Sequence, residues 1–180
     1  MPSHRTRLIL KTIAFTLLAA GAIAAAGAAA VFYGGLYYVG ATKHHLPIIY
    51  GVLEKGMQYS VRRNARDIDV PRLGAPEQVR RGAAVYRDHC AQCHGGPGFA
   101  QSSIGMSMQP VPGPLIDATL NWKDREIYWI TRHGIKMSGM PAWEFHLSDA
   151  DIWATVAFIR QLPDMSAQDY RAITANEAQP

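Results

Sequence analysis

The sequence predicts an all-α protein with an N-terminal transmembrane helix followed by a small helical domain. Three observations support this fold class. Residues 12–42 form a run of 31 positions without Asp, Glu, Lys, Arg or His. Beyond that run, apolar residues recur at steps of three and four, which is typical of helices. Proline, serine, aspartate and glycine stand at positions that favour helix starts and ends.

Residues 1–11 and 12–42 together predict a membrane anchor. The first segment contains three basic residues and no acid, and such flanks stay in the cytoplasm. A spanning helix needs about 20 apolar residues, whereas the apolar region of a signal peptide usually has about 7–15. The uncharged run is therefore expected to be a transmembrane anchor in a lipid bilayer. Cleavage after Ala30, where Ala28 and Ala30 form an A-x-A pattern, is the alternative.

The net charge of +4 is concentrated near this anchor. Residues 41–74 carry six basic and three acidic side chains, whereas residues 75–163 carry eight of each sign. A nucleic-acid-binding domain would need a basic face, so we expect no nucleic-acid partner. The basic segments are better suited to a membrane surface with anionic lipids.

Residues 43–75 are predicted to form an amphipathic juxtamembrane helix and a linker. Pro47 suits the first turn of this helix. We expect the helix to lie on lipid or on a partner protein, with packing on the domain that follows as the other option. Prolines and a glycine between residues 67 and 76 predict an extended linker. His44 and His45 are interpreted as interfacial polar residues rather than as a metal site. The apolar stripe of the helix consists of Leu46, Ile49, Leu53, Met57 and Val61.

Three further helices are predicted in residues 76–163, and residues 164–180 are expected to be a C-terminal tail. The helix at 76–90 begins with a proline, and the helix at 124–133 ends at a glycine. The helix at 149–162 lies between a serine N-cap and a proline. These boundaries indicate one small domain.

The chain contains two cysteines, Cys90 and Cys93. A disulfide between them would close a loop too short to stabilise much. Zinc would normally need a second pair of ligands, and a thioredoxin-like pair would need a strand–turn–helix setting. His94 follows immediately, and C-x-x-C-H is the signature of haem attachment. We therefore predict that Cys90 and Cys93 hold one covalent haem c and that His94 binds its iron.

Gly82, Tyr86 and Cys90 lie four residues apart on one helix face. A glycine, an aromatic residue and the first cysteine of C-x-x-C-H at these spacings resemble the N-terminal helix of class I c-type cytochromes. The resemblance implies a haem domain of that family over residues 76–163. In that family this helix crosses the C-terminal helix at the glycine, and residues 149–162 are the matching helix here.

Met140 is the expected sixth ligand of the iron. Residues 138–143 resemble the family's axial-methionine loop, with a glycine before Met140 and a proline after it. A thioether ligand raises the reduction potential. Met137 is the alternative ligand. Four other residues are interpreted as packing, loop or surface groups rather than ligands: Met106, Met108, His133 and His146.

A carbonyl of the proline-rich loop at 110–115 is expected to orient the ring of His94, as the resemblance implies. Pro112 and Pro114 are both favoured, with no choice between them. Three aromatic residues near the site are expected to pack in the core, and a hydrogen bond to a haem propionate is the alternative for each: Trp122, Tyr128 and Trp143.

A haem with both axial positions filled predicts a one-electron carrier and not an enzyme. The expected partners are membrane-bound or periplasmic redox proteins: a quinol-oxidising complex, a haem–copper oxidase or a dehydrogenase. The chain is either a shuttle or a fixed subunit of such a complex. Haem c is attached outside the cytoplasm, which predicts a bacterial inner-membrane protein with its haem domain in the periplasm. A haem sensor or peroxidase with an open or displaceable sixth ligand is the alternative function.

Overall fold

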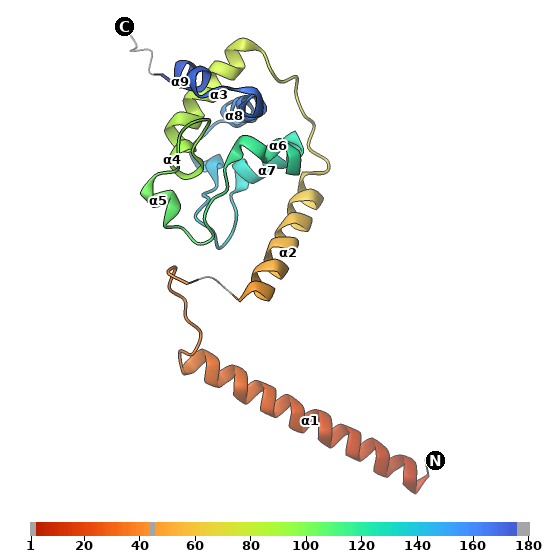
Figure 1. Cartoon of the computed structure of the whole chain (residues 1–180). Coiled ribbons are helices and arrows are strands. Elements are labelled where there is room, and N and C mark those ends of the chain that lie inside the picture. The colour runs from red at the N-terminus through yellow and green to blue at the C-terminus, as the bar shows by residue number, and fades with distance from the viewer. Residues whose placement is uncertain (1–2, 44–45, 176–180) are drawn as a thin grey trace. The chain divides into compact units, whose positions relative to one another are not determined.

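The computed structural model describes residues 3–43 and 46–175. The described residues are helical or irregular, and they contain no strand apart from an isolated bridge between Gly96 and Phe99. The chain divides into two compact units, residues 1–40 and residues 41–180 (Figure 1). The predicted all-α fold class is confirmed.

The first unit contains α1, His4–Tyr33. This helix has 30 residues, which corresponds to about 45 Å, and none of them is buried. By length and composition it can cross a membrane. The Ser3 hydroxyl caps its start, so the basic N-terminal residues belong to the helix rather than precede it. The helix ends at Tyr33 instead of near residue 42, because Gly34 and Gly35 follow and Gly35 has a φ of 63°.

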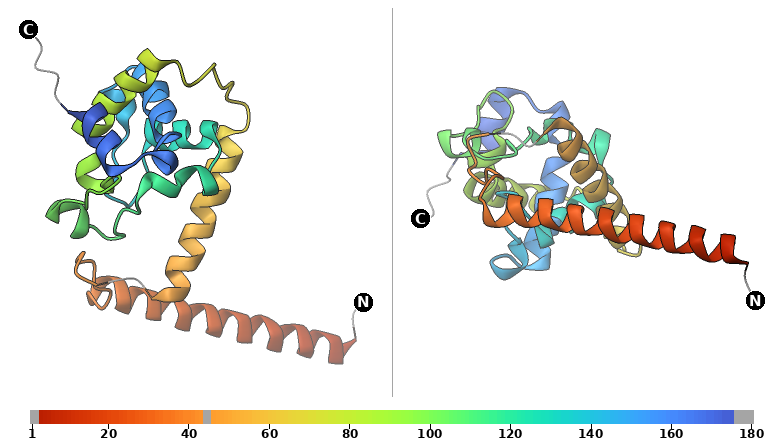
Figure 2. Two further views of the ribbon diagram at one scale, coloured as in Figure 1. Left: turned by 45° about the horizontal axis from the view of Figure 1, so that its top comes forward. Right: turned by 90° about the horizontal axis from the view of Figure 1, so that it is seen from below.

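The second unit begins with α2, Pro47–Ala65, the expected amphipathic helix. Its C-terminal end packs on the domain, where Val61 and Ala65 are buried and α2 contacts α7, Asp124–His133. Figures 1 and 2 show this end of α2 beside α7 and α6, Ala118–Asn121. This end of α2 therefore packs on the domain rather than on lipid or a partner protein. The segment after α2, residues 68–75, forms neither helix nor strand, and its extended conformation stays a prediction.

α3, Pro76–His89, crosses α8, Asp149–Ile159, at the centre of the domain. The two helices touch at Gly82, where a Cβ atom would overlap the backbone carbonyl of Ala154. Only a glycine allows this approach. The crossing at Gly82 that the family resemblance implied is therefore present.

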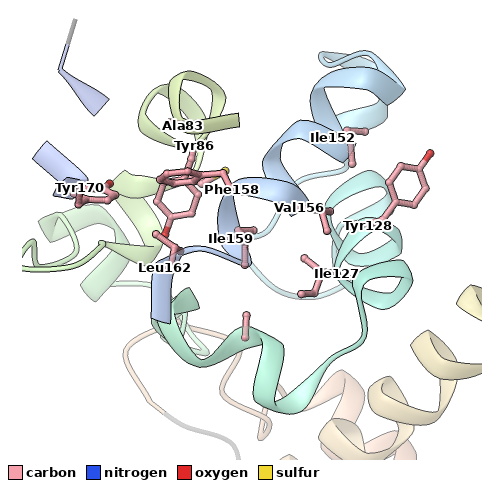
Figure 3. Packing of buried hydrophobic residues seen from close by; sticks show 12 residues of the cluster. Ala83, Tyr86, Ile127, Tyr128, Ile152, Val156, Phe158, Ile159, Leu162 and Tyr170 are labelled. Atoms are coloured by element: carbon pink, nitrogen blue, oxygen red, sulfur yellow. The ribbon is translucent and has the colours of Figure 1, made fainter. Parts of the chain in front are cut away.

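The hydrophobic core lies between α3, α7 and α8 (Figure 3). Tyr86 and Phe158 pack with their ring centroids 5.2 Å apart. The Tyr86 hydroxyl donates a hydrogen bond of 2.8 Å to the Gly95 carbonyl. Burial raises the pKa of Tyr86, so the phenol remains a neutral donor. The labelled core side chains are Ala83, Tyr86, Ile127, Tyr128, Ile152, Val156, Phe158, Ile159, Leu162 and Tyr170.

A capping box links the start of α8 to α3. The Ser148 hydroxyl accepts a hydrogen bond from the Asp151 backbone N–H, as expected for the N-cap. The Asp151 carboxylate also pairs with Arg81 of α3 at 2.6 Å, and these bonds lower its pKa. α8 ends at Ile159, three residues earlier than expected. Pro163, which was expected to end α8, lies in the short helix η3, Leu162–Asp164.

The C-terminal segment, expected to be a tail, contains a helix. α9, Ala167–Thr174, packs on α3 and buries Tyr170. The Tyr170 ring lies edge-on to Tyr86, with centroids 6.4 Å apart. Ser166 and Asp169 form a capping box at the start of α9. This S-x-x-D spacing is a local signal for a helix after Pro163 that the expectation of a tail did not take into account.

Replacing Gly82 by alanine is expected to lower the free energy of unfolding by about 1–3 kcal/mol, the usual cost of overpacking. The new methyl group would push α8 away, and this outweighs the better helix propensity of alanine, about 1 kcal/mol. Denaturant unfolding followed by circular dichroism measures the change. Gly56→Ala in α2 is the matched control, because no atom lies within 4 Å of a Cβ there. Equal stability of the two variants would contradict the close contact.

Candidate cofactor site

The C-x-x-C-H segment lies where α3 passes into the short helix α4, Ala91–His94. The Cys90 N–H still donates to the Tyr86 carbonyl at 2.9 Å, and the His94 N–H donates to the Cys90 carbonyl at 2.9 Å. Cys90 is buried and Cys93 is half-buried, and neither forms a disulfide. Burial, together with the nearby Cys93, raises the pKa of the Cys90 thiol to about 12. Both thiols line one cavity.

His94 is oriented by a hydrogen bond between Nδ1 and the Gly113 carbonyl, at 2.8 Å. A carbonyl only accepts, so Nδ1 carries the proton and Nε2 has a free lone pair. Burial lowers the pKa of His94 and favours the neutral ring. A neutral imidazole with a free Nε2 is a common metal ligand.

The acceptor for His94 corrects the expectation of Pro112 or Pro114. The residue between those two prolines supplies the carbonyl. Successive carbonyls of this loop point in different directions, and the Pro112 carbonyl accepts from the Gln101 side chain instead. Gln101 is a residue that the sequence analysis missed, because no motif marks it. Its side chain fixes the loop that holds His94.

Two neighbouring cavities, of about 360 and 270 Å³, surround His94. Both are lined by His94 and Met140, and the larger one also by Cys90 and Cys93. Their walls are largely apolar. Five further residues line both: Gly113, Leu115, Thr131, Ile135 and Ile159.

Met140 is presented by a closed turn after α7. The Ser138 hydroxyl donates to the Ile135 carbonyl at 2.7 Å and accepts from the Met140 N–H at 3.2 Å. Gly134 begins this turn with a φ of 65°. Met137, the alternative ligand, is 82% exposed and lines neither cavity. The structure thus brings Met140, and not Met137, to the cavities with His94. The ligand role of Met140 stays a prediction.

The methionines and histidines that were not expected to be ligands differ in whether they line the two cavities. Met108 lines the larger cavity, whereas Met106 is 63% exposed. His133 pairs with Glu144 at 3.2 Å, and neither His133 nor His146 lines the two cavities. His44 and His45 lie outside the described residues.

Two of the three candidate aromatic residues line the cavities. Trp143 lines the larger cavity and Trp122 the smaller one. Tyr128 lines neither: its ring stacks on Trp153 with centroids 4.1 Å apart, and its hydroxyl donates to Asp149 at 2.8 Å. For Tyr128, core packing is therefore the correct interpretation.

Comparison with known proteins identifies the domain. Residues 77–159 match the family described as cytochrome C oxidase, cbb3-type, subunit III. This range contains the C-x-x-C-H segment, Met140 and both crossing helices. The matched segment is a c-type cytochrome domain. A curated relative, the Cbb3-type cytochrome c oxidase subunit CcoP of Azospirillum brasilense, is 30% identical over 108 residues. These are 58% of this chain and 33% of the relative, so the chain spans about a third of that protein's length.

Cytochromes of this type hold haem c covalently, and the residues of this chain fit that cofactor. Two thiols, a neutral imidazole and a thioether line two neighbouring cavities with largely apolar walls. Thiols can form thioethers with a porphyrin, and His and Met are suitable axial ligands of iron. The cytochrome domain thus contains the chemical groups that its family requires.

Replacing Gly134 by asparagine is expected to destabilise the domain by about 1–3 kcal/mol. Gly134 has a φ of 65° and a ψ of −171°, a backbone conformation essentially limited to glycine, and an asparagine Cβ would in addition lie 2.6 Å from the Pro141 carbonyl carbon and 2.7 Å from the Met140 oxygen. Gly74→Asn is the matched control, since Gly74 also has a positive φ but has no atom within 4 Å of a Cβ. Thermal unfolding compares the two variants. If both lose the same stability, the close approach of the Met140 segment is refuted.

Proposed function

We propose that this cytochrome is a one-electron carrier with a single haem c. Cys90 and Cys93 would hold the haem through thioethers, and His94 and Met140 would be its axial ligands. The main observation that supports this proposal is that all four side chains line one cavity of about 360 Å³. When bound, haem supplies an Fe(III)/Fe(II) couple. The sequence has one C-x-x-C-H segment, which supports one haem on this chain.

The two cavities around His94 together form a crevice, and the residues that line it favour electron transfer over substrate chemistry. Gly113 accepts from His94, and Ser138 holds the turn of Met140, so two polar groups near the site are used to position ligands. The Thr131 hydroxyl donates to the Ile127 carbonyl at 2.9 Å, within its own helix. Electron transfer needs a fixed iron environment and no proton donor or nucleophile. These side chains provide that environment.

The haem domain is placed in the periplasm under this proposal. α1 is long and apolar enough to span a membrane, and Arg5, Arg7 and Lys11 lie at its N-terminal end. Basic residues stay on the cytoplasmic side, so the segment after α1 would lie outside. The protein would be a single-pass protein of a bacterial inner membrane, in which haem attachment occurs on the outer side.

The proposed partner is a membrane-bound haem–copper oxidase. The relative's name assigns it to a cbb3-type cytochrome c oxidase, and the matching family is named after a subunit of the same oxidase. A tethered carrier has a high effective concentration beside a membrane partner. We infer that this chain delivers electrons to such an oxidase, either as a subunit or as a tethered donor.

Replacing Met140 by alanine should abolish the near-infrared band of the sulfur–iron bond and lower the reduction potential. Loss of a thioether ligand favours ferric iron. We expect a shift of at least tenfold in the ferric/ferrous ratio, which corresponds to about 59 mV or more for one electron. Absorption spectroscopy and redox titration measure both effects. Met137→Ala is the control and should leave them unchanged, because this side chain is 82% exposed.

Two outcomes would sink the ligand assignment: loss of the band in Met137→Ala, or its persistence in Met140→Ala. Ready binding of CO by the unaltered protein would favour a haem sensor or peroxidase with a displaceable ligand.

Purification of the full chain from membranes in mild detergent tests the partner. We expect oxidase subunits to accompany it, because the chain is proposed to act at that complex. Mass spectrometry of the haem-stained fraction identifies them. Co-purification with a dehydrogenase, without any oxidase subunit, would overturn the assignment.

A further inference from the structure

One face of α2 contacts α7 at its C-terminal end and lines both cavities farther toward its N-terminal end. The side chains of this face are separated by seven, four and four residues, so they share one side of the helix. Val61 and Ala65, at its C-terminal end, are 1% and 0% exposed. Tyr50 and Met57 continue the same face toward the N-terminal end of α2. This face therefore approaches the site from outside the segment that matches the cytochrome family.

Tyr50 and Met57 each line a different cavity. Tyr50 lines the larger cavity, together with Cys90, Cys93 and His94. Met57 lines the smaller cavity, together with His94 and Met140. Because both cavities surround His94, one helix contributes a wall residue to each of them.

Contacts on the C-terminal half of α2 hold this face in place. The guanidinium of Arg62 lies over the Trp122 ring, 5.9 Å from its centroid. Trp122 itself lines the smaller cavity. The Arg66 carbonyl, directly after α2, accepts a hydrogen bond from Arg125 of α7 at 3.0 Å. These contacts fix α2 to α7 and to a wall of the crevice.

The opposite face of α2 makes no such contacts with the described part of the domain. Ile48, Val52 and Tyr59 are 76%, 68% and 70% exposed. The helix is therefore apolar on two sides, and its two faces have different surroundings. This difference allows matched substitutions on one helix.

We propose that α2 is the outer wall of the haem crevice, with Tyr50 and Met57 as the residues that cover it. The inference rests on the proposed function, since it takes haem to occupy the crevice. Ferric haem carries one more positive charge than ferrous haem, and a dry, apolar shell disfavours the extra charge. Tyr50, which is 46% exposed, and Met57 thus limit the access of water to the crevice and raise the reduction potential of the haem. They are positioning and shielding residues, not ligands.

The test compares Tyr50→Ser with Tyr59→Ser in the full chain, purified in mild detergent with its haem attached. Both remove a tyrosine from α2, but only Tyr50 lines the crevice. Redox titration is expected to show a threefold or larger shift toward ferric iron in Tyr50→Ser and none in Tyr59→Ser. Oxidation of the ferrous protein by ferricyanide, which needs no partner protein, should also become faster only in Tyr50→Ser.

A second pair of variants separates shielding from folding. Met57→Ser should lower the potential in the same direction, whereas Met57→Leu, which keeps an apolar side chain of similar size, should retain it. Circular dichroism checks that α2 remains helical in each variant. Equal reduction potentials in Tyr50→Ser and Tyr59→Ser, or in Met57→Ser and Met57→Leu, would refute the proposal that α2 is the outer wall of the crevice.

The failure of the proposed function has a different signature. A purified chain without covalent haem on a denaturing gel would overturn the proposed function and this inference together. If the chain contains haem but its reduction potential is unchanged in both Tyr50→Ser and Met57→Ser, only the proposed role of α2 is overturned.

Discussion

The contact of α3 with α8 at Gly82 is the constraint on which the rest of the domain depends. There the backbone carbonyl of Ala154 occupies the space that a side chain would fill. A contact of backbone with backbone cannot be relaxed by a change of rotamer. α3 therefore leaves the crossing in a fixed direction and delivers Cys90 at its end. On the other side of the crossing, α8 contributes Thr155 and Ile159 to the wall of the larger cavity. One glycine thus sets the spacing between Cys90 and the facing wall of the cavity.

The loops around the crevice are held in a different way, by single hydrogen bonds that involve backbone groups. His94 pairs with the Gly113 carbonyl, Gln101 donates to the Pro112 carbonyl, and the Ser138 hydroxyl bonds the Met140 N–H. Each bond fixes one loop residue, so the loops depend on the helices for their position but on these bonds for their orientation. Such bonds leave weak traces in a sequence, because any residue supplies a carbonyl or an N–H.

Local signals account for the parts of the fold that could be predicted. α7 has the expected bounds, because acidic residues at its start and Gly134 after its end act within a few residues. The capping box of Ser148 and Asp151 is equally local. The carbonyl that bonds His94 could not be predicted, since three prolines leave several registers open and packing between distant segments selects one. The start of α9 has a local signal, the capping box of Ser166 and Asp169, but the burial of Tyr170 depends on α3 and α8 and could not be predicted.

The stripe of α2 shows most clearly where periodicity stops being informative. The predicted stripe contains Leu46 and Leu53, which are 67% and 50% exposed, whereas the face that meets the domain includes Ala65. When a helix is apolar on two sides, its sequence does not show which side is buried. In α2, contacts with α7 determine the buried side.

Under the proposed role of α2, this choice has a chemical consequence, because the buried face contributes to the dryness of the crevice. The same helix is the first one after α1 in the chain. Any partner that binds α2 firmly enough to shift it would then act on the polarity around the iron. An oxidase that binds this helix would influence the reduction potential of its own electron donor.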